Sequence, residues 1–148
     1  MNETDKLYRL IWMSRPLMQA AEAAVEQGLD GTGLTVRTRA VLEILLAHDA
    51  ATVPDIAQHL EIKRQYVQVM VNETLAENLT CKRDNPRHKR STIIALTDKG
   101  RALIEDVVQR EKALVASLAA ELDAGEINTA LKIVETLIDK LKTQAGDG

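Results

Sequence analysis

Apolar residues recur every three or four positions along most of the chain, the spacing that places them on one side of an α-helix. The first such stretch covers residues 4–27 and contains Pro16. A proline inside a helix removes a backbone hydrogen-bond donor and crowds the preceding turn. We therefore predict either a kinked helix or two shorter helices that meet near Ser14 and Arg15, followed by a break at the glycines 28, 31 and 33.

Three shorter helices are predicted next. Thr35 is a suitable N-cap for a helix that continues to residue 48, and Thr52 with Pro54 suits the start of a short helix that ends at residue 60. The following apolar stripe predicts a helix over 64–77 with a polar opposite side, and Asn78 can end it in a left-handed conformation.

The second half of the chain predicts a hairpin and two long helices. Residues 80–84 and 91–96 are short enough for strands, the second is rich in β-branched side chains, and the polar residues 85–90 join them. Residues 97–118 and 124–142 return to helical spacing. The predicted fold class is therefore mainly α with a small β-hairpin wing, in one domain of 148 residues that needs no disulfide or structural metal.

The predicted elements follow one another in the order of a winged helix-turn-helix, in which the second helix of a pair enters the major groove of DNA. That helix needs long polar side chains near its start, because arginine can bind guanine, and amides can bind adenine, through two hydrogen bonds. A solvated helix surface is the alternative interpretation of the same residues. The candidates are Lys63, Arg64, Gln65, Gln68 and Asn72.

The charge distribution favours the interpretation as a DNA-binding protein. The net charge of −3 argues at first against a polyanionic partner. However, residues 63–101 contain nine basic and four acidic side chains, a net charge of +5, which leaves −8 for the rest of the chain. A run of cationic residues at the hairpin tip can lie along phosphates or enter a narrow minor groove. This run is Arg87, His88, Lys89 and Arg90.

Several short motifs, in their order and spacing, resemble the MarR family of winged helix-turn-helix repressors over nearly the whole chain. Each is weak alone, but together they are a specific signal. They are Leu34-Thr35-Val36-Arg37, Val53-Pro54-Asp55-Ile56-Ala57-Gln58-His59-Leu60, Arg64-Gln65-Tyr66-Val67-Gln68, Asn85-Pro86 with Lys89-Arg90-Ser91, and Ala95-Leu96-Thr97-Asp98-Lys99-Gly100-Arg101.

The resemblance implies a single domain over residues 1–148 that acts as an obligate homodimer on a double-stranded DNA operator. Residues 34–100 would form the winged-helix DNA-binding region, and residues 4–33 and 101–143 the dimerisation helices. The local sequence agrees, because the long amphipathic helices outside the DNA-binding region carry wide apolar stripes that one protomer has limited means to cover. Packing within a single chain is the alternative.

Members of the family commonly bind a small phenolic or anionic effector and then release DNA. Near the predicted helix break, Trp12, Met13 and Arg15 offer an apolar wall and one cation, which could hold an aromatic acid. The alternative interpretation places Trp12 and Met13 in the core and Arg15 on the surface.

Among several departures from the family pattern, two bear on the contacts to DNA, while Thr74 and Asn78, in place of the commoner apolar residue and glycine, concern the structure. His88 stands where the family often has an acid that supports the wing arginine, although the role that the resemblance implies for Arg90 can still be carried over. Val69 stands where an arginine is frequent on the recognition helix. The base preference is therefore predicted to differ, and an apolar contact to thymine methyl groups is one option.

Other classes of function find little support in the sequence. An enzyme would need a nucleophile with an oriented base, a glycine-rich phosphate loop or paired carboxylates, and no such motif is visible. The single Cys81 and the scattered histidines predict neither a redox switch nor a metal site, and no cofactor is expected. Without an apolar run of membrane-spanning length, we expect a cytoplasmic protein. The alternative function is a winged-helix module that binds protein rather than DNA.

Overall fold

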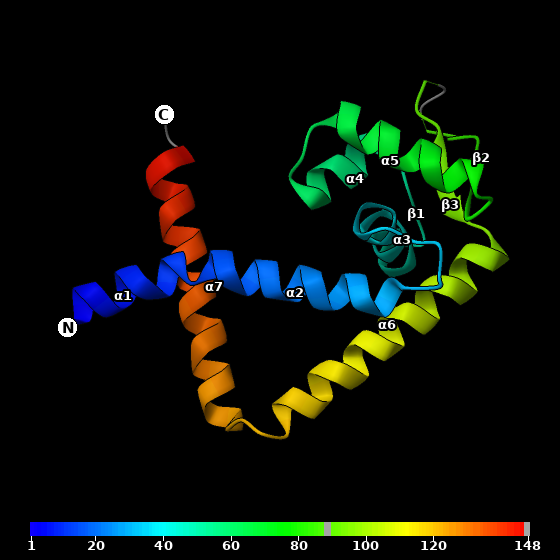
Figure 1. Cartoon of the computed structure of the whole chain (residues 1–148). Helices are drawn as coiled ribbons and strands as arrows, with labels where there is room; N and C mark the ends of the chain where they lie inside the picture. Colours follow the sequence, from blue (N-terminus) through cyan, green and yellow to red (C-terminus); the bar gives the residue numbers. More distant parts are fainter. Residues whose placement is uncertain (88–89, 147–148) are drawn as a thin grey trace. The chain divides into compact units, whose positions relative to one another are not determined.

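The computed structural model describes residues 1–87 and 90–146, in which helices dominate and one small sheet is present (Figure 1). The chain forms two compact units, Met1–Glu111 and Lys112–Gly148. The helices are α1 (Glu3–Trp12), α2 (Ser14–Leu29), α3 (Val36–His48), α4 (Val53–Leu60), α5 (Arg64–Ala76), α6 (Asp98–Ala119) and α7 (Ala124–Gly146), and the strands are β1 (Ala50–Ala51), β2 (Thr80–Arg83) and β3 (Ile93–Leu96). The predicted fold class, mainly α with a small β-hairpin, is confirmed.

The first predicted stretch consists of two helices, α1 and α2, which are separated at Met13. The prediction of a break at Gly28 was wrong, because α2 continues through this residue to Leu29. A glycine inside a helix costs about 1 kcal/mol relative to alanine, which burial of the Leu29 side chain can offset. The chain turns only afterwards, where Gly31 and Gly33 both adopt a φ of +80°.

Side-chain caps fix the starts of the two helices that follow. Thr35 accepts a hydrogen bond from the backbone of Thr38 at the start of α3, and Thr52 accepts one from Asp55 at the start of α4. In return, the Thr38 side chain accepts a hydrogen bond from the backbone N–H of Thr35, and the Asp55 side chain accepts one from that of Thr52. Each pair thus satisfies two backbone donors that would otherwise lack a partner. At the other end of α5, Asn78 adopts a φ of 58°, as predicted.

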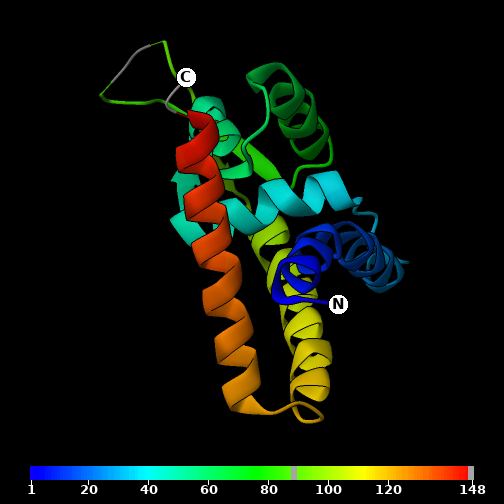
Figure 2. The same ribbon diagram turned by 90° about the vertical axis from the view of Figure 1, so that its left-hand side faces the viewer.

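The sheet has three strands in the order β1-β3-β2, all antiparallel. The hairpin of β2 and β3 was predicted, whereas β1 was not, because two alanines carry no recognisable strand pattern. Ala95 of β3 pairs with Ala50 on one side and with Cys81 on the other. The sheet and the helices of the first unit are seen from a second direction in Figure 2.

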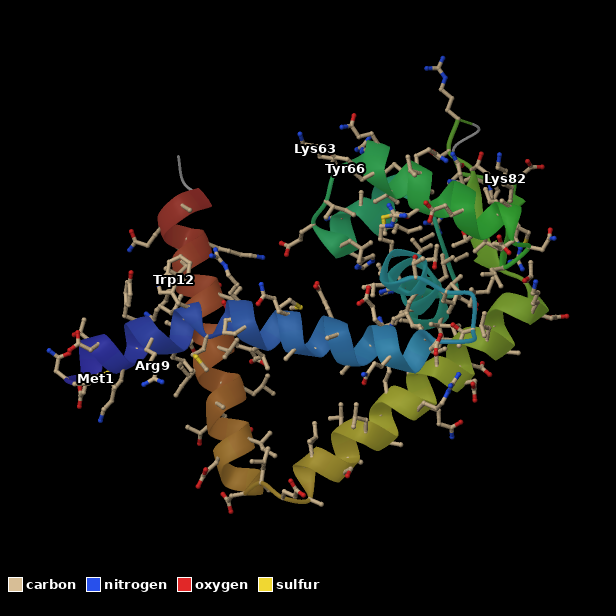
Figure 3. All side chains as sticks on the ribbon, viewed as in Figure 1. Met1, Arg9, Trp12, Lys63, Tyr66 and Lys82 are labelled. Atoms are coloured by element: carbon tan, nitrogen blue, oxygen red, sulfur yellow. The ribbon has the colours of Figure 1, made fainter. Side chains whose placement is uncertain are left out.

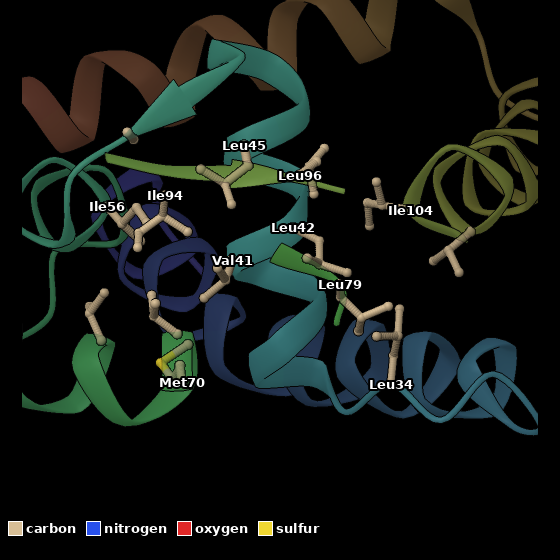
Figure 4. Packing of buried hydrophobic residues seen from close by; sticks show 14 of the residues in the cluster. Leu34, Val41, Leu42, Leu45, Ile56, Met70, Leu79, Ile94, Leu96 and Ile104 are labelled. Atoms are coloured by element: carbon tan, nitrogen blue, oxygen red, sulfur yellow. The ribbon is translucent and has the colours of Figure 1, made fainter. Parts of the chain in front are cut away.

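The core of the first unit is aliphatic, since the sequence contains no phenylalanine. It gathers side chains from α3, α4, α5, the sheet and the first turns of α6 (Figure 4). Among the described residues three polar side chains are buried, Thr38, Thr74 and Thr80, and the last two satisfy each other: their hydroxyls are 2.8 Å apart, and Thr74 also donates to the carbonyl of Val71. The fully buried members include Val41, Leu42, Leu45, Ile56, Val67, Val71 and Ile104.

A close contact joins the end of α5 to the beginning of α6. The backbone N–H of Thr97 donates to the carbonyl of Leu79 at 3.1 Å, and the Thr97 hydroxyl donates to the carbonyl of Asn78 at 2.7 Å. A Cβ atom on Gly100 would overlap the carbonyl oxygen of Leu79 and lie 2.8 Å from its carbonyl carbon. Residue 100 must therefore be glycine for α6 to approach this turn.

A salt bridge network ties α3 to α6. Arg39 binds Glu111 through two hydrogen bonds, from Nε to Oε1 and from Nη2 to Oε2, both 2.7 Å long, and also contacts Glu43. Burial disfavours the charged guanidinium, but the hydrogen bonds and the two carboxylates outweigh it and raise the pKa of Arg39 above its ordinary value. Arg39 is thus a paired cation that structures the unit and is not available to a ligand.

Long apolar stripes remain uncovered on several helices. Within residues 124–146 no side chain is buried, and in α1 and α2 only Leu29 is. None of the helices in residues 1–87 and 90–146 combines the length and apolar character that a membrane crossing requires. The exposed large apolar residues include Leu7, Leu10, Leu17 and Met18 of α1 and α2, and Ile127, Leu131, Val134, Ile138 and Leu141 of α7.

Replacing Gly100 with alanine is expected to lower the free energy of unfolding by about 3 kcal/mol, because the new methyl group collides with backbone atoms that cannot rotate away. Gly28→Ala is the matched control. Gly28 also lies in a helix but has open space around its Cα, so alanine there should raise stability by up to about 1 kcal/mol. Urea denaturation of both variants measures the difference, and equal stabilities would contradict the proposed contact.

Candidate nucleic-acid interface

Helix α5 buries one side and presents the other to solvent. Val67, Met70 and Val71 pack into the core, and Val69 follows Val67 by a rotation of about 200°. Gln65 and Asn72, four residues before and three after Val69, share its side of the helix. The exposed Tyr66 borders this side of the helix beside Val69. We call four of the exposed residues of α5 the reading face: Gln65, Gln68, Val69 and Asn72.

A hydrogen bond organises the reading face. The side-chain amide of Gln68 donates from Nε2 to Oδ1 of Asn72, one turn later, at 2.9 Å. Such a pair at i and i+4 restrains both side chains on the helix surface. The bond occupies one of the two lone pairs of Asn72 Oδ1, and both Nδ2 hydrogens remain available to donate.

The first turn of α5 and the wing enclose a hollow of about 550 Å³. Three cations line it, Arg64 from α5, Lys82 from β2 and Arg90 from the loop that follows β2, and none of the described residues around it is acidic. Gln65 and Gln68 of the reading face also line the hollow. Since the three cations come from separate segments, the fold has concentrated positive charge on one side of the reading face, where an anion can approach.

The residues predicted to bind DNA largely come together here. Arg64, Gln65, Gln68 and Arg90 all line the hollow, and Asn72 adjoins it through its bond to Gln68. Lys63 is exposed immediately before α5 (Figure 3). Arg87 is exposed on the wing loop, where its backbone N–H donates to the side chain of Asn85. His88 and Lys89 lie outside the described residues.

Sequence reasoning did not single out Lys82 or the polar residues Ser91 and Thr92, which also line the hollow. Lys82 is paired with Ile94 across the hairpin, and directly opposite residues of antiparallel strands share a face. That pairing would have identified Lys82, but the register of a hairpin with a long loop is not evident from the sequence. The signal that the sequence offered for Lys82 was its position within residues 63–101, the segment with the net charge of +5.

The residues considered for an effector lie at the junction of α1 and α2. Trp12 is 52% exposed and Met13 49%, so neither is a core residue of the protomer. The guanidinium of Arg15 lies 5.7 Å from the centre of the ring of Trp12, which Figure 3 labels, and the Tyr8 ring meets the same ring edge-on with 6.2 Å between centres. Trp12, Tyr8 and Arg15 thus form an exposed aromatic and cationic cluster.

Two further groups bear on other chemistries. His48 and His59, distant in sequence, stack at 4.2 Å between ring centres, an arrangement that their sequence separation did not suggest. Among the described residues, however, no group of three or more histidine, cysteine, aspartate or glutamate side chains is placed to hold a metal ion. Cys81 is a free thiol on β2 and is partly buried.

Comparison with known proteins places this geometry in context. No protein-family model matches the chain. The HTH-type transcriptional repressor MdtR of Bacillus subtilis is 27% identical over 144 residues, which cover 97% of this chain and 93% of MdtR. The crystal structure of a mutant of MarR from E. coli complexed with operator DNA has the same fold, with a TM-score of 0.79 at 18% identity, and covers 93% of this chain and 99% of that one.

The crystal structure of the MarR family transcription regulator SP03579 is more similar in sequence. It superposes with a TM-score of 0.91 at 34% identity, and the match covers 99% of this chain and 97% of that chain. A match of this coverage includes the helices outside the winged region as well as the winged region itself. This chain therefore belongs to the MarR family of transcription regulators.

Proposed function

We propose that this protein is a sequence-specific regulator that binds a double-stranded DNA operator as a homodimer in the cytoplasm and represses transcription, and that it is not an enzyme. The observation that carries the proposal is the hollow beside the reading face, where Arg64, Lys82 and Arg90 from three segments surround two glutamines. Cations fix a protein on the phosphate backbone, whereas amides on a helix read base edges, so this pairing fits duplex DNA.

The residues divide into two roles under this proposal. Lys63, Arg64 and Arg90 neutralise phosphates and hold α5 in register in the major groove, while Gln65, Gln68 and Asn72 contact bases. Residues 87–90 at the tip of the wing contact the phosphate backbone of the DNA or enter its adjacent minor groove. Repression then follows from occupancy of the operator, and the similarity to the repressor MdtR supports this direction of control.

The homodimer is supported by the apolar stripes that the chain leaves uncovered. Leu131, Ile138 and Leu141 of α7 are each at least half exposed, as are Leu17 and Met18 of α2. Exposed apolar surface on this scale marks an interaction site in a water-soluble protein. A second copy of the same helices is the partner that the family resemblance implies, and a dimer would place two reading faces on successive turns of the duplex.

A small aromatic or anionic effector is the third part of the proposal. Trp12 and Met13 offer apolar surface and Arg15 a cation, which together suit an aromatic carboxylate. Binding of such a molecule near the junction of α1 and α2 would alter the dimer and release the DNA.

Duplexes selected from genomic fragments are expected to bind with an affinity that falls steeply as salt is added, because phosphate contacts release counterions. Arg90→Ala should weaken binding to all duplexes and reduce the salt slope by about one, whereas Gln65→Ala should relax the preference at particular base pairs. Fluorescence anisotropy at several salt concentrations measures both effects. Arg110→Ala, which removes an exposed arginine that pairs with Asp106 on α6, is the control and should bind normally.

If the protein bound no duplex at low salt, or bound a protein partner with an affinity that does not change with salt, it would be the alternative winged-helix module. The proposal of a DNA-binding regulator would then be wrong.

In solution the protein is expected to have about twice the chain mass of 16.3 kDa by light scattering. Leu131→Glu places a charge in the apolar stripe of α7 and should shift the mass toward that of the monomer. Lys140→Glu, on the opposite side of the same helix, changes the charge without touching the stripe and should leave the dimer intact. A wild-type protein that remained monomeric at micromolar concentration would refute the dimer.

Salicylate is expected to quench the emission of Trp12 along a saturating curve, since Trp12 is the single tryptophan in the sequence and lies beside Arg15. Arg15→Ala should weaken the apparent affinity, because it removes the cation that would pair with the carboxylate. The absence of any saturating change over millimolar additions would argue against a pocket at this junction.

A further inference from the structure

Val69 is the apolar member of the reading face. It is 53% exposed at the edge of the three amides, next to Tyr66, which is 57% exposed, and it points away from the core that Val67 and Val71 enter. A β-branched residue is a modest helix former, so valine at this exposed position does not improve the helix itself. Its side chain is available to an apolar group of a partner.

Asn72 lies beside Val69 on the same side of α5, three residues later. Its carbonyl oxygen already accepts the hydrogen bond from Gln68, at 2.9 Å. This bond takes one of the two lone pairs of Oδ1 and restrains the amide, so the paired contact that an isolated asparagine makes to adenine is disfavoured. Both donor hydrogens of Nδ2 stay available to a base.

The reading face therefore offers an apolar group and a hydrogen-bond donor side by side. In the major groove only thymine carries the complement, because its O4 is an acceptor and its C5 bears a methyl group. Guanine offers two acceptors and no methyl group, adenine an acceptor with a donor, and cytosine a donor. We propose that Val69 and Asn72 together read one thymine, Val69 through the methyl group and Asn72 through O4.

This inference rests on the proposed function, since it assigns a base to a helix that must first enter the major groove. It goes further by naming the base and by dividing its recognition between two side chains. Besides its own proposed base contact, Gln68 positions Asn72, because the hydrogen bond between them restrains which atoms of that amide face the DNA.

The test uses the purified full chain and the tightest duplex from the selection, with each thymine replaced in turn. Deoxyuridine keeps O4 and removes the methyl group, whereas 5-methylcytosine opposite guanine keeps the methyl group and replaces O4 with a donor. At one thymine of each half-site, deoxyuridine should weaken binding about fourfold, the value of one buried methyl group. At that position 5-methylcytosine should weaken it about tenfold or more.

Two variants separate the two contacts. Val69→Ala should bind the thymine and deoxyuridine duplexes with equal affinity. It should still bind the 5-methylcytosine duplex more weakly than the thymine duplex. Asn72→Ala should bind the 5-methylcytosine duplex almost as tightly as the thymine duplex, and it should still bind the thymine duplex more tightly than the deoxyuridine duplex. Gln68→Ala, which frees the acceptor of Asn72, should narrow the discrimination against 5-methylcytosine and leave the methyl effect unchanged.

The outcomes distinguish this inference from the proposed function. A chain that binds no duplex refutes the proposed function itself. A chain that binds but tolerates deoxyuridine at every thymine overturns the inference while DNA binding stands. A methyl effect that persists unchanged in Val69→Ala overturns the assignment to Val69.

Discussion

The contact between Gly100 and the carbonyl group of Leu79 is the constraint on which the DNA-binding region depends. It brings the start of α6 against the turn that ends α5, and the hydrogen bonds of Thr97 to Leu79 and Asn78 fasten it there. The same turn leads directly into β2, so one small region fixes the recognition helix, the wing and the long helix together. Such a junction has no room for a side chain, which explains why a glycine occupies the first turn of a helix that would otherwise favour alanine.

Much of this fold follows from local signals in the sequence. The spacing of apolar residues and the caps Thr35 and Thr52 located α3 and α4, and Asn78 marked the end of α5. The errors have a common cause. Strand β1 is two alanines whose structure exists only through pairing with β3, and α2 passes through Gly28 because the burial of Leu29 compensates for the glycine. Both depend on contacts distant in sequence, which local patterns do not contain.

The candidate site was predictable in its residue types and less so in its arrangement. Arg64, Gln65, Gln68 and Arg90 were expected from polarity and charge, and the structure brings them around one hollow. Lys82 joins them only through the register of the hairpin, and the hydrogen bond from Gln68 to Asn72 depends on side-chain conformation. Polarity identifies which residues could meet a base, whereas the bonds among them decide which atoms are presented to it.

The separation of charge along the chain has a consequence for how the protein finds its target. Residues 1–62 and 102–148 each carry nine acidic and five basic side chains, and the excess of positive charge lies between them. A polyanion is repelled by both flanks and attracted only to the segment that holds α5 and the wing. Long-range forces should therefore rotate the molecule during its approach, so that encounters with the double helix in other orientations are short-lived.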